Sequence, residues 1–261
     1  MNPVEVVLGA LSGSIVGFTL GLVGGGGSIL AVPLMVYVVG VQNPHVAIGT
    51  SALAVAANAL IGLGNHARKG HVKWPCALTF ASAGVLGAWT GALFGKSVDG
   101  EKLLALFALL MLVVAALMLR ARGQGGDATV RISRQNAPKL VATGTATGLL
   151  SGFFGIGGGF LVVPSLIAAT RMPILAAVGS SLVAVTAFGL TTAISYASSG
   201  LVSWPLAAIF IAGGAVGSVA GTRTAVHLAD RKGALNLVMA GLITVVAIYM
   251  LYRTTHAMAF S

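Results

Sequence analysis

Two glycine-rich stretches of this sequence have a composition and spacing that could form a binding site. The first runs from Gly24 to Ser28 and the second from Gly155 to Gly159, and each precedes a short apolar segment that contains a proline. Consecutive glycines break a helix, because each costs about 1 kcal/mol relative to alanine in a helix interior. A break leaves backbone N–H groups without partners, and the start of the next helix carries about half a positive charge. Two such ends facing one cavity would bind an anion through backbone donors.

Hydroxyl side chains close to each stretch could complete such a site. Thr50-Ser51 and Ser180-Ser181 begin the next apolar segment in each half of the chain. These hydroxyls could equally bond to their own helix backbone, and the glycines could serve only close helix packing, so both alternatives stay open. The predicted substrate-binding residues are Gly25, Gly26, Gly27, Ser28, Thr50, Ser51, Gly157, Gly158, Gly159, Phe160, Ser180 and Ser181.

The composition indicates what kind of protein must position these residues. Of the 261 residues, 57% are hydrophobic and only 8% are charged, and the mean hydropathy is +0.98. A soluble domain carries about 25% charged residues, and an outer-membrane barrel needs short alternating strands rather than unbroken apolar runs. Only helices satisfy their own backbone polar groups along such runs in lipid. The predicted fold class is therefore an all-α polytopic membrane protein.

Ten apolar segments, five on each side of a polar stretch, divide the chain into two halves. We predict a first membrane repeat at residues 1–120, a cytoplasmic linker at 121–138 and a second membrane repeat at 139–261. The predicted segments are Val4–Leu22, Ser28–Val39, Val46–Asn65, Trp74–Phe94, Leu103–Leu119, Leu140–Phe154, Phe160–Ala169, Ile174–Ala197, Trp204–Val226 and Ala234–Tyr252.

The two halves can be aligned on one another. Glycines and a proline of the first half recur 131 positions later, and the motifs that follow recur at an offset of 130. The matched residues include Gly17 with Gly148, Gly21 with Gly152, Gly24 with Gly155, Pro33 with Pro164, Gly49-Thr50-Ser51 with Gly179-Ser180-Ser181, and Trp74-Pro75 with Trp204-Pro205. So many coincidences at almost one offset indicate a duplicated unit.

The distribution of basic residues predicts that the two repeats are inverted. The loop around Arg68, the central linker and the loop around Arg231 hold 11 of the 15 Lys and Arg residues, which places these loops in the cytoplasm. The counterpart of the first loop, 196–203, has no charge and should lie outside. Inversion requires an odd number of net crossings per half. We therefore predict three spanning helices in each half plus a broken or re-entrant helical hairpin with the glycines at its tip, as in inverted-repeat transporters.

The remaining polar residues exclude several classes of function. The net charge of +10 is carried by loops between apolar runs, so it favours membrane orientation over nucleic-acid binding. The single cysteine and the scattered histidines show no metal-ligand spacing, and we expect neither a metal nor another cofactor. All five carboxylates lie in loops or at segment ends, which favours an anionic substrate over a cation or proton relay. Asn58 lies in mid-span, where its amide is costly unless it is paired.

These patterns resemble the TauE/SafE family of sulfite exporters. The resemblance rests on the paired motifs GLVGGGGSILAVP and GFFGIGGGFLVVP, on AIGTSAL and AAVGSSL, and on the Trp-Pro pair and glycine-stepped helix that follow each. It covers nearly the whole chain except the linker. It implies a bacterial inner-membrane permease that moves sulfite, sulfoacetate or a related organosulfur anion.

The sequence therefore predicts a secondary transporter, not an enzyme, that moves a small sulfur oxyanion by alternating access across the bacterial inner membrane. Its partners would be the lipid bilayer and the anion, without nucleic acid, and homo-oligomer formation is left open. Two alternatives stay open, namely a non-transporting membrane assembly subunit and a transporter of a different small anion. A membrane-embedded enzyme is disfavoured, because no nucleophile with a base and no carboxylate lies inside the predicted spans.

Overall fold

The structure is a computed structural model that describes residues 2–120, 132–133, 135–157, 159–228, 241 and 243–253. Within these residues the chain forms helices and connecting loops and no strand, which confirms the predicted all-α class. The predicted linker at 121–138 falls mostly outside the described residues. The elements are α1 (Pro3–Val23), the 3-10 helix η1 (Gly24–Leu30), α2 (Ala31–Pro33), the π-helix η2 (Leu34–Val38), α3 (Pro44–Arg68), α4 (Trp74–Ser97), α5 (Gly100–Arg120), α6 (Ala137–Phe154), α7 (Gly159–Thr170), α8 (Ile174–Ala197), α9 (Trp204–Leu228) and a last helix at Ile243–Arg253.

Local signals in the sequence set the starts of the long helices. α1 begins with a capping box, in which the backbone N–H of Asn2 donates to the Glu5 carboxylate over 3.1 Å. Asn43 caps α3, because its side-chain oxygen accepts hydrogen bonds from the backbone N–H groups of His45 and Val46. A proline lies in the first turn of α1, α3, α4 and α6, where its missing N–H leaves no helical bond unmade.

Several of these helices are long and apolar enough to cross a membrane. Five such stretches occur in the described chain, namely Pro3–Val38, Pro44–Arg68, Trp74–Ser97, Ile174–Ala197 and Trp204–Thr224. Large apolar side chains remain exposed along them, with Leu86 at 74% and Val216 at 73% of their full accessibility. Such a surface suits lipid rather than water. The chain is therefore a multi-pass membrane protein.

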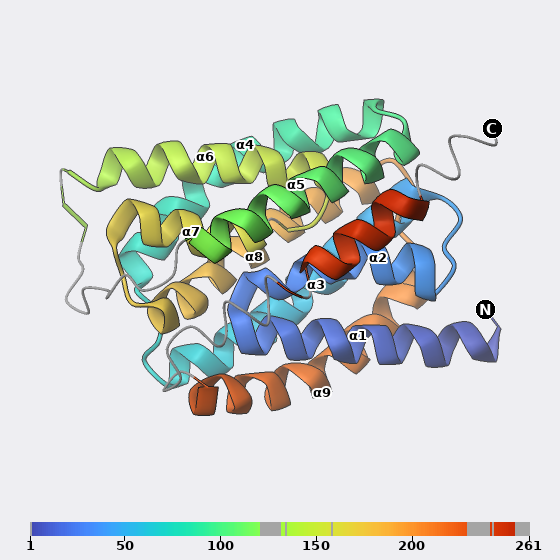
Figure 1. Cartoon of the computed structure of the whole chain (residues 1–261), viewed down its shortest axis with the longest axis horizontal. Coiled ribbons are helices and arrows are strands. Elements are labelled where there is room, and N and C mark those ends of the chain that lie inside the picture. The colour runs from blue at the N-terminus through green and yellow to red at the C-terminus, as the bar shows by residue number, and fades with distance from the viewer. Residues whose placement is uncertain are drawn as a thin grey trace.

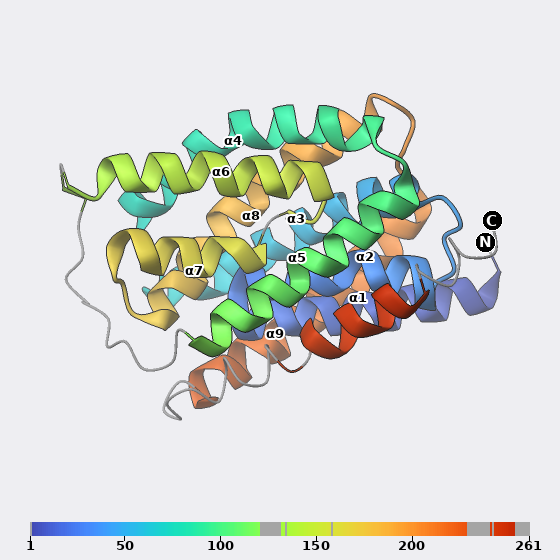
Figure 2. The same cartoon turned by 45° about the horizontal axis from the view of Figure 1, so that its top comes forward.

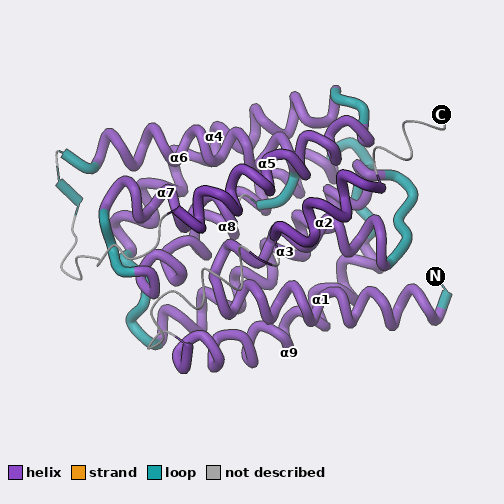
Figure 3. The backbone as a smooth tube through the Cα atoms, in the orientation of Figure 1, coloured by secondary structure: helices purple, strands orange, loops and turns teal. Residues whose placement is uncertain are grey.

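The helices form two outer pairs around a central crossing pair. α1 packs along α9 on one side, α4 packs along α6 on the other, and α3 and α8 lie between them (Figure 1). The same pairs are visible after rotation in Figure 2, and the tube in Figure 3 shows that short loops join most of the helices. In the alignment of the two halves, α6 is the counterpart of α1 and α9 is the counterpart of α4. Each outer pair therefore joins one helix of the first half to one helix of the second.

Glycines allow each outer pair to approach backbone to backbone. Gly17 of α1 lies against the backbone of Gly214 in α9, so that a Cβ added to Gly17 would overlap the Gly214 carbonyl. The matched position Gly148 of α6 lies in the same way against the backbone of Gly84 in α4. Small residues at this spacing are the usual means by which membrane helices pack closely. The regularly spaced glycines seen in the sequence thus form the contact surfaces of the two outer helix pairs.

Charged side chains are distributed unevenly between the two ends of the molecule. At the end opposite the N-terminus, α3 and α9 finish and α4, α6 and α8 begin (Figure 1); we call it the basic end. The described basic residues there are Arg68, Lys69, Lys73, Lys139, Arg171 and Arg223. The described carboxylates, Glu5, Asp99 and Glu101, lie at the other end, near the start of α1 and in the turn between α4 and α5. Three described cations, Lys96, Lys102 and Arg253, lie at that end as well.

Candidate functional site

The first glycine stretch turns the chain back on α1. Gly24 ends α1 with a φ of +65°, a left-handed conformation that favours glycine. The following residues form η1, which packs back along α1, so that Gly27 lies against the backbone of Thr19 and Leu20. The Thr19 hydroxyl is 3.4 Å from the Gly27 carbonyl oxygen. The stretch is therefore a tight 3-10 helix and not an open loop.

The second glycine stretch is more irregular. Gly155 ends α6 in the left-handed region with a φ of +68°, and Gly157 has a φ of +66°. The backbone N–H of Ile156 bonds back to the Ser151 carbonyl at 3.2 Å, which closes the end of α6. α7 then begins at Gly159. The predicted site residue Gly158 lies outside the described residues.

The two stretches meet in the interior of the molecule. A Cβ added to Gly25 would come within 2.5 Å of the Gly159 Cα, and a Cβ on Gly159 would overlap the Gly25 carbonyl. The backbone N–H of Gly25 also donates to the Ser181 hydroxyl of α8 over 3.1 Å. A segment of the first half is thus linked to two elements of the second half through its backbone.

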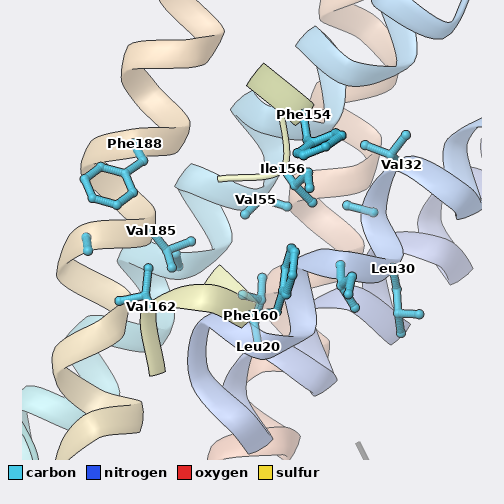
Figure 4. Packing of buried hydrophobic residues seen from close by; sticks show 14 of the residues in the cluster. Leu20, Leu30, Val32, Val55, Phe154, Ile156, Phe160, Val162, Val185 and Phe188 are labelled. Carbon is cyan, nitrogen blue, oxygen red and sulfur yellow. The ribbon is translucent and has the colours of Figure 1, made fainter. Parts of the chain in front are cut away.

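Apolar side chains surround this contact. Figure 4 shows Val55 of α3, Ile156, Phe160 of α7 and Val185 of α8 gathered around the glycine stretches. Each of the four is at most 1% exposed. The chain is therefore closed at this point in the present conformation.

The predicted hydroxyls divide into two groups. Ser181 lies at the glycine contact, and Ser28 lies within η1, where its hydroxyl donates to the Gly25 carbonyl over 2.9 Å. Ser51 donates to the Ile48 carbonyl of its own helix at 3.0 Å. Thr50 and Ser180 are engaged elsewhere, each accepting a hydrogen bond from the loop residue that precedes a long helix. The two bonds, both 2.9 Å long, run from the Ser203 N–H to the Thr50 hydroxyl and from the Lys73 N–H to the Ser180 hydroxyl.

A second set of polar groups lies in the interior, and of these only Asn58 had been singled out from the sequence. The Thr192, Ser195 and Tyr196 hydroxyls of α8 and the Ser218 hydroxyl of α9 are buried and have no hydrogen-bond partner among the described residues. Neither the nitrogen nor the oxygen of the Asn58 amide has a partner either, and this amide packs against Gly214. The residue types and their places within apolar segments were visible in the sequence, but the lack of partners could be seen only from the packing.

A cavity of about 200 Å³ lies at the basic end between α3 and α9. Its lining residues are Asn65, Arg68, Lys69, Val219, Thr222 and Arg223. The buried amide nitrogen of Asn65 has no hydrogen-bond partner in the part of the chain that the structure describes. Three cations and an amide donor gather here, and the described carboxylates lie at the other end of the molecule. The cavity therefore carries a concentration of positive charge.

A histidine pair lies close to this cavity. The Nε2 of His66, which is fully buried, lies 3.2 Å from the Gly21 carbonyl and must donate to it. A neutral His66 then accepts at Nδ1 from the Nδ1 of His71, 3.4 Å away in the loop before α4. Burial, with a smaller contribution from the charge of Lys69, lowers the pKa of His71. This shift favours the neutral form of His71.

The described residues contain no group of three His, Cys, Asp or Glu side chains that could hold a metal ion. Cys76, the single cysteine, is buried and free, in agreement with a packing role.

Comparison with known proteins supplies the family. The family described as "Sulfite exporter TauE/SafE" matches residues 9–250. A probable membrane transporter protein of Xylella fastidiosa is 52% identical over 248 residues, which cover 93% of this chain and 94% of that protein. Probable membrane transporter proteins of Methanocaldococcus jannaschii and Bacillus subtilis are each 28% identical, over 75% and 80% of this chain and 78% and 82% of their own lengths. No solved structure matches the chain. The match confirms the resemblance seen in the motifs, and the chain belongs to the sulfite exporter TauE/SafE family.

Proposed function

We propose that this membrane transporter moves a small sulfur oxyanion, such as sulfite or sulfoacetate, by alternating access between two inverted repeats in the inner membrane of a bacterium. The family name supports the substrate class, and the related proteins are named as probable membrane transporters. The location of the described carboxylates at one end, away from the buried helix crossing, supports an anionic rather than a cationic cargo.

The direction of matched helices supports the inverted arrangement. α1 starts at the end of the molecule opposite the basic end, whereas its counterpart α6 starts at the basic end (Figure 1). α3 and α8 are likewise matched and run in opposite directions. With the basic end in the cytoplasm, equivalent surfaces of the two repeats would face opposite sides of the membrane. Rocking of one repeat against the other would then expose one central site to each side in turn.

The observation that carries the central site is the contact between the two glycine stretches. Gly25 and Gly159 touch through their backbones, and the Gly25 N–H reaches across to Ser181. We assign the substrate to this point, between Gly25–Ser28 and Gly157–Phe160, when the repeats move apart. Once the two stretches no longer touch, the backbone N–H groups at the start of α7 and of η1 would face the anion instead. The hydroxyls of Ser51 and Ser181 would add donors, whereas Thr50 and Ser180 would hold the ends of α9 and α4 in place.

The test is flux of ³⁵S-labelled sulfite in proteoliposomes. We expect Gly26→Val and Gly157→Val to reduce flux by at least about tenfold, because a side chain in the site removes one charge-assisted hydrogen bond or more. Gly64→Val is the matched control, since a Cβ at Gly64 meets nothing within 4 Å. Folding is checked by thiol labelling of Cys76, which is buried in the folded protein. Wild-type flux in both folded site variants would remove the assignment of the site.

A further inference from the structure

Buried polar groups without partners lie on α8 toward the end of the molecule opposite the basic end. Thr192, Ser195 and Tyr196 follow one another at helical spacing, so they share one face of α8. All three are at most 1% exposed, and their hydroxyls find no partner among the described residues. A hydroxyl that loses water without gaining a hydrogen bond destabilises the fold, so a packing role alone does not explain three of them.

A cation accompanies these hydroxyls. The Lys96 ammonium of α4 donates to the Ser195 carbonyl at 2.9 Å and to the Ser199 hydroxyl at 3.0 Å, and it lies 5.9 Å from the centre of the Tyr196 ring. The ring of His45 lies 6.3 Å from the Tyr196 ring, and its Nδ1 is buried without a partner. The ammonium charge attracts an oxyanion and repels a metal cation, and the neighbouring hydroxyls can donate hydrogen bonds to the oxyanion.

The basic end has a related arrangement on α3. The cavity there brings Asn65 of α3 and Thr222 of α9 together with Arg68, Lys69 and Arg223. The next polar side chain inward on α9 is Ser218, which is fully buried and unpartnered, and Asn58 lies beyond it on α3. A line of unpaired polar atoms thus leads from this cavity towards the interior.

The two arrangements occupy matched positions of the repeat. At the offset of 130, Gly62, Asn65 and His66 of α3 correspond to Thr192, Ser195 and Tyr196 of α8. The residue types differ, yet in both halves this turn of the central helix carries buried polar groups beside a cation. Since α3 and α8 run in opposite directions (Figure 1), the two turns lie at opposite ends of the molecule.

We propose that these are two oxyanion-binding stations, one at each mouth of the transport path. The basic-end station consists of Asn65, Arg68, Lys69, Thr222 and Arg223. The opposite-end station consists of Lys96, Thr192, Ser195 and Tyr196. This inference rests on the proposed anion transport, but it concerns residues outside the glycine site. Each station holds the anion as it enters or leaves on its own side, and the glycine contact separates the two.

The experiment measures the KM for labelled sulfite from each side, in right-side-out and inside-out membrane vesicles. Thr192→Val, Ser195→Ala and Tyr196→Phe each remove only the hydroxyl, and we expect each to raise the KM about tenfold on the opposite-end side alone. Arg68→Gln combined with Arg223→Gln should raise the KM by at least that factor on the basic-end side. The matched controls are Thr191→Val, whose hydroxyl bonds to the Ala187 carbonyl, and Lys139→Gln, an exposed cation of the basic end outside the cavity. Both controls should keep the wild-type KM on both sides.

A second measurement separates binding from packing. In detergent, we would follow the melting temperature of wild type and variants by Cys76 labelling, with and without sulfite, sulfate or sulfoacetate. Without anion, the hydroxyl-deleted variants should melt at or above the wild-type temperature, since they lose unpaired buried groups. Added anion should raise their melting temperature by less than it raises that of the wild type. If the variants show the wild-type KM on both sides and the wild-type rise in melting temperature with anion, the proposal of two stations is wrong, while the proposal of anion transport still stands. A wild type that neither transports sulfite nor gains stability from any of these anions would overturn the transport proposal and the stations together.

Discussion

The two glycine stretches occupy matched positions of the repeat but differ in structure. The first is a continuous 3-10 helix that packs on α1, and its Gly25 N–H donates a hydrogen bond to Ser181 of the other half. The second has two left-handed glycines, and the matched N–H, that of Ile156, bonds within its own half to Ser151. Among the described residues, Ser51, the counterpart of Ser181, bonds to its own helix alone.

Two differences between the aligned stretches account for much of this contrast. Gly25 matches Ile156 and Ser28 matches Gly159. Without a side chain, Gly25 lies directly against Gly159, whereas the Ile156 side chain is buried beside the contact (Figure 4). The first stretch therefore makes the link between the halves and the second fills the space around it. The two stretches are similar in sequence, yet they make different contacts.

The largest expected effect comes from adding a methyl group at the contact itself. Gly25→Ala and Gly159→Ala place a Cβ against backbone, which cannot move as a flexible side chain can. Overpacking of this kind costs about 1–3 kcal/mol or more, measured by heating the protein in detergent with thiol labelling of Cys76. Gly64→Ala, in open space, should be as stable as wild type or better. Wild-type stability of Gly25→Ala would mean that the stretches do not touch.

The second prediction tests the unequal hydrogen bonding of the matched serines. Ser181→Ala leaves the buried Gly25 N–H without its acceptor, which costs about 1–3 kcal/mol. Ser51→Ala removes only a donor to a helix carbonyl, so its cost should lie at the low end of about 0.5–1.5 kcal/mol. The same melting assay compares the two variants. Equal losses would show that the first stretch is not the one that links the halves.

The third prediction concerns the left-handed glycines of the second stretch. Gly157→Ala should cost about 1–2 kcal/mol for its backbone conformation, with a small addition because the new Cβ lies 3.2 Å from Val55 Cγ1. Gly200→Ala has nearly the same φ in open space and measures the backbone cost alone. Unfolding free energies in a denaturant series give the difference between the two. A Gly157→Ala variant less affected than Gly200→Ala would contradict the left-handed φ at Gly157.

The smallest effect is expected at the side chain that distinguishes the second stretch. Ile156→Val removes one buried methylene and should cost about 0.5–1.5 kcal/mol. Ile194→Val, at an exposed position of α8, should change stability by less than about 0.5 kcal/mol. Both are compared in the denaturant series. If Ile156→Val were as mild as Ile194→Val, Ile156 would not fill the interior.

Much of the fold could be predicted from the sequence, because its signals are local. Apolar length and terminal prolines predicted α8 at Ile174–Ala197 and the start of α4 at Trp74. The glycine spacing predicted close packing, but it does not say which helices pair, and the pairing of Gly17 with Gly214 depends on the whole assembly. The same limit holds for the candidate site. Nothing near Thr50 in the sequence indicates that its hydroxyl accepts the Ser203 N–H, and nothing near Tyr196 indicates an unpartnered hydroxyl.

In each outer pair a helix of the first half packs on a helix of the second half, and this pairing has a consequence for biosynthesis. α1 leaves the ribosome first, yet the helix that covers its glycine face, α9, is made near the end of the chain. Contacts between such distant segments form late in folding. Until then the glycine face of α1 is left to lipid or to an insertion chaperone, and α4 similarly awaits α6. A chain stopped after the first half would leave both faces open, so the two repeats must be completed together before either is protected from misassembly.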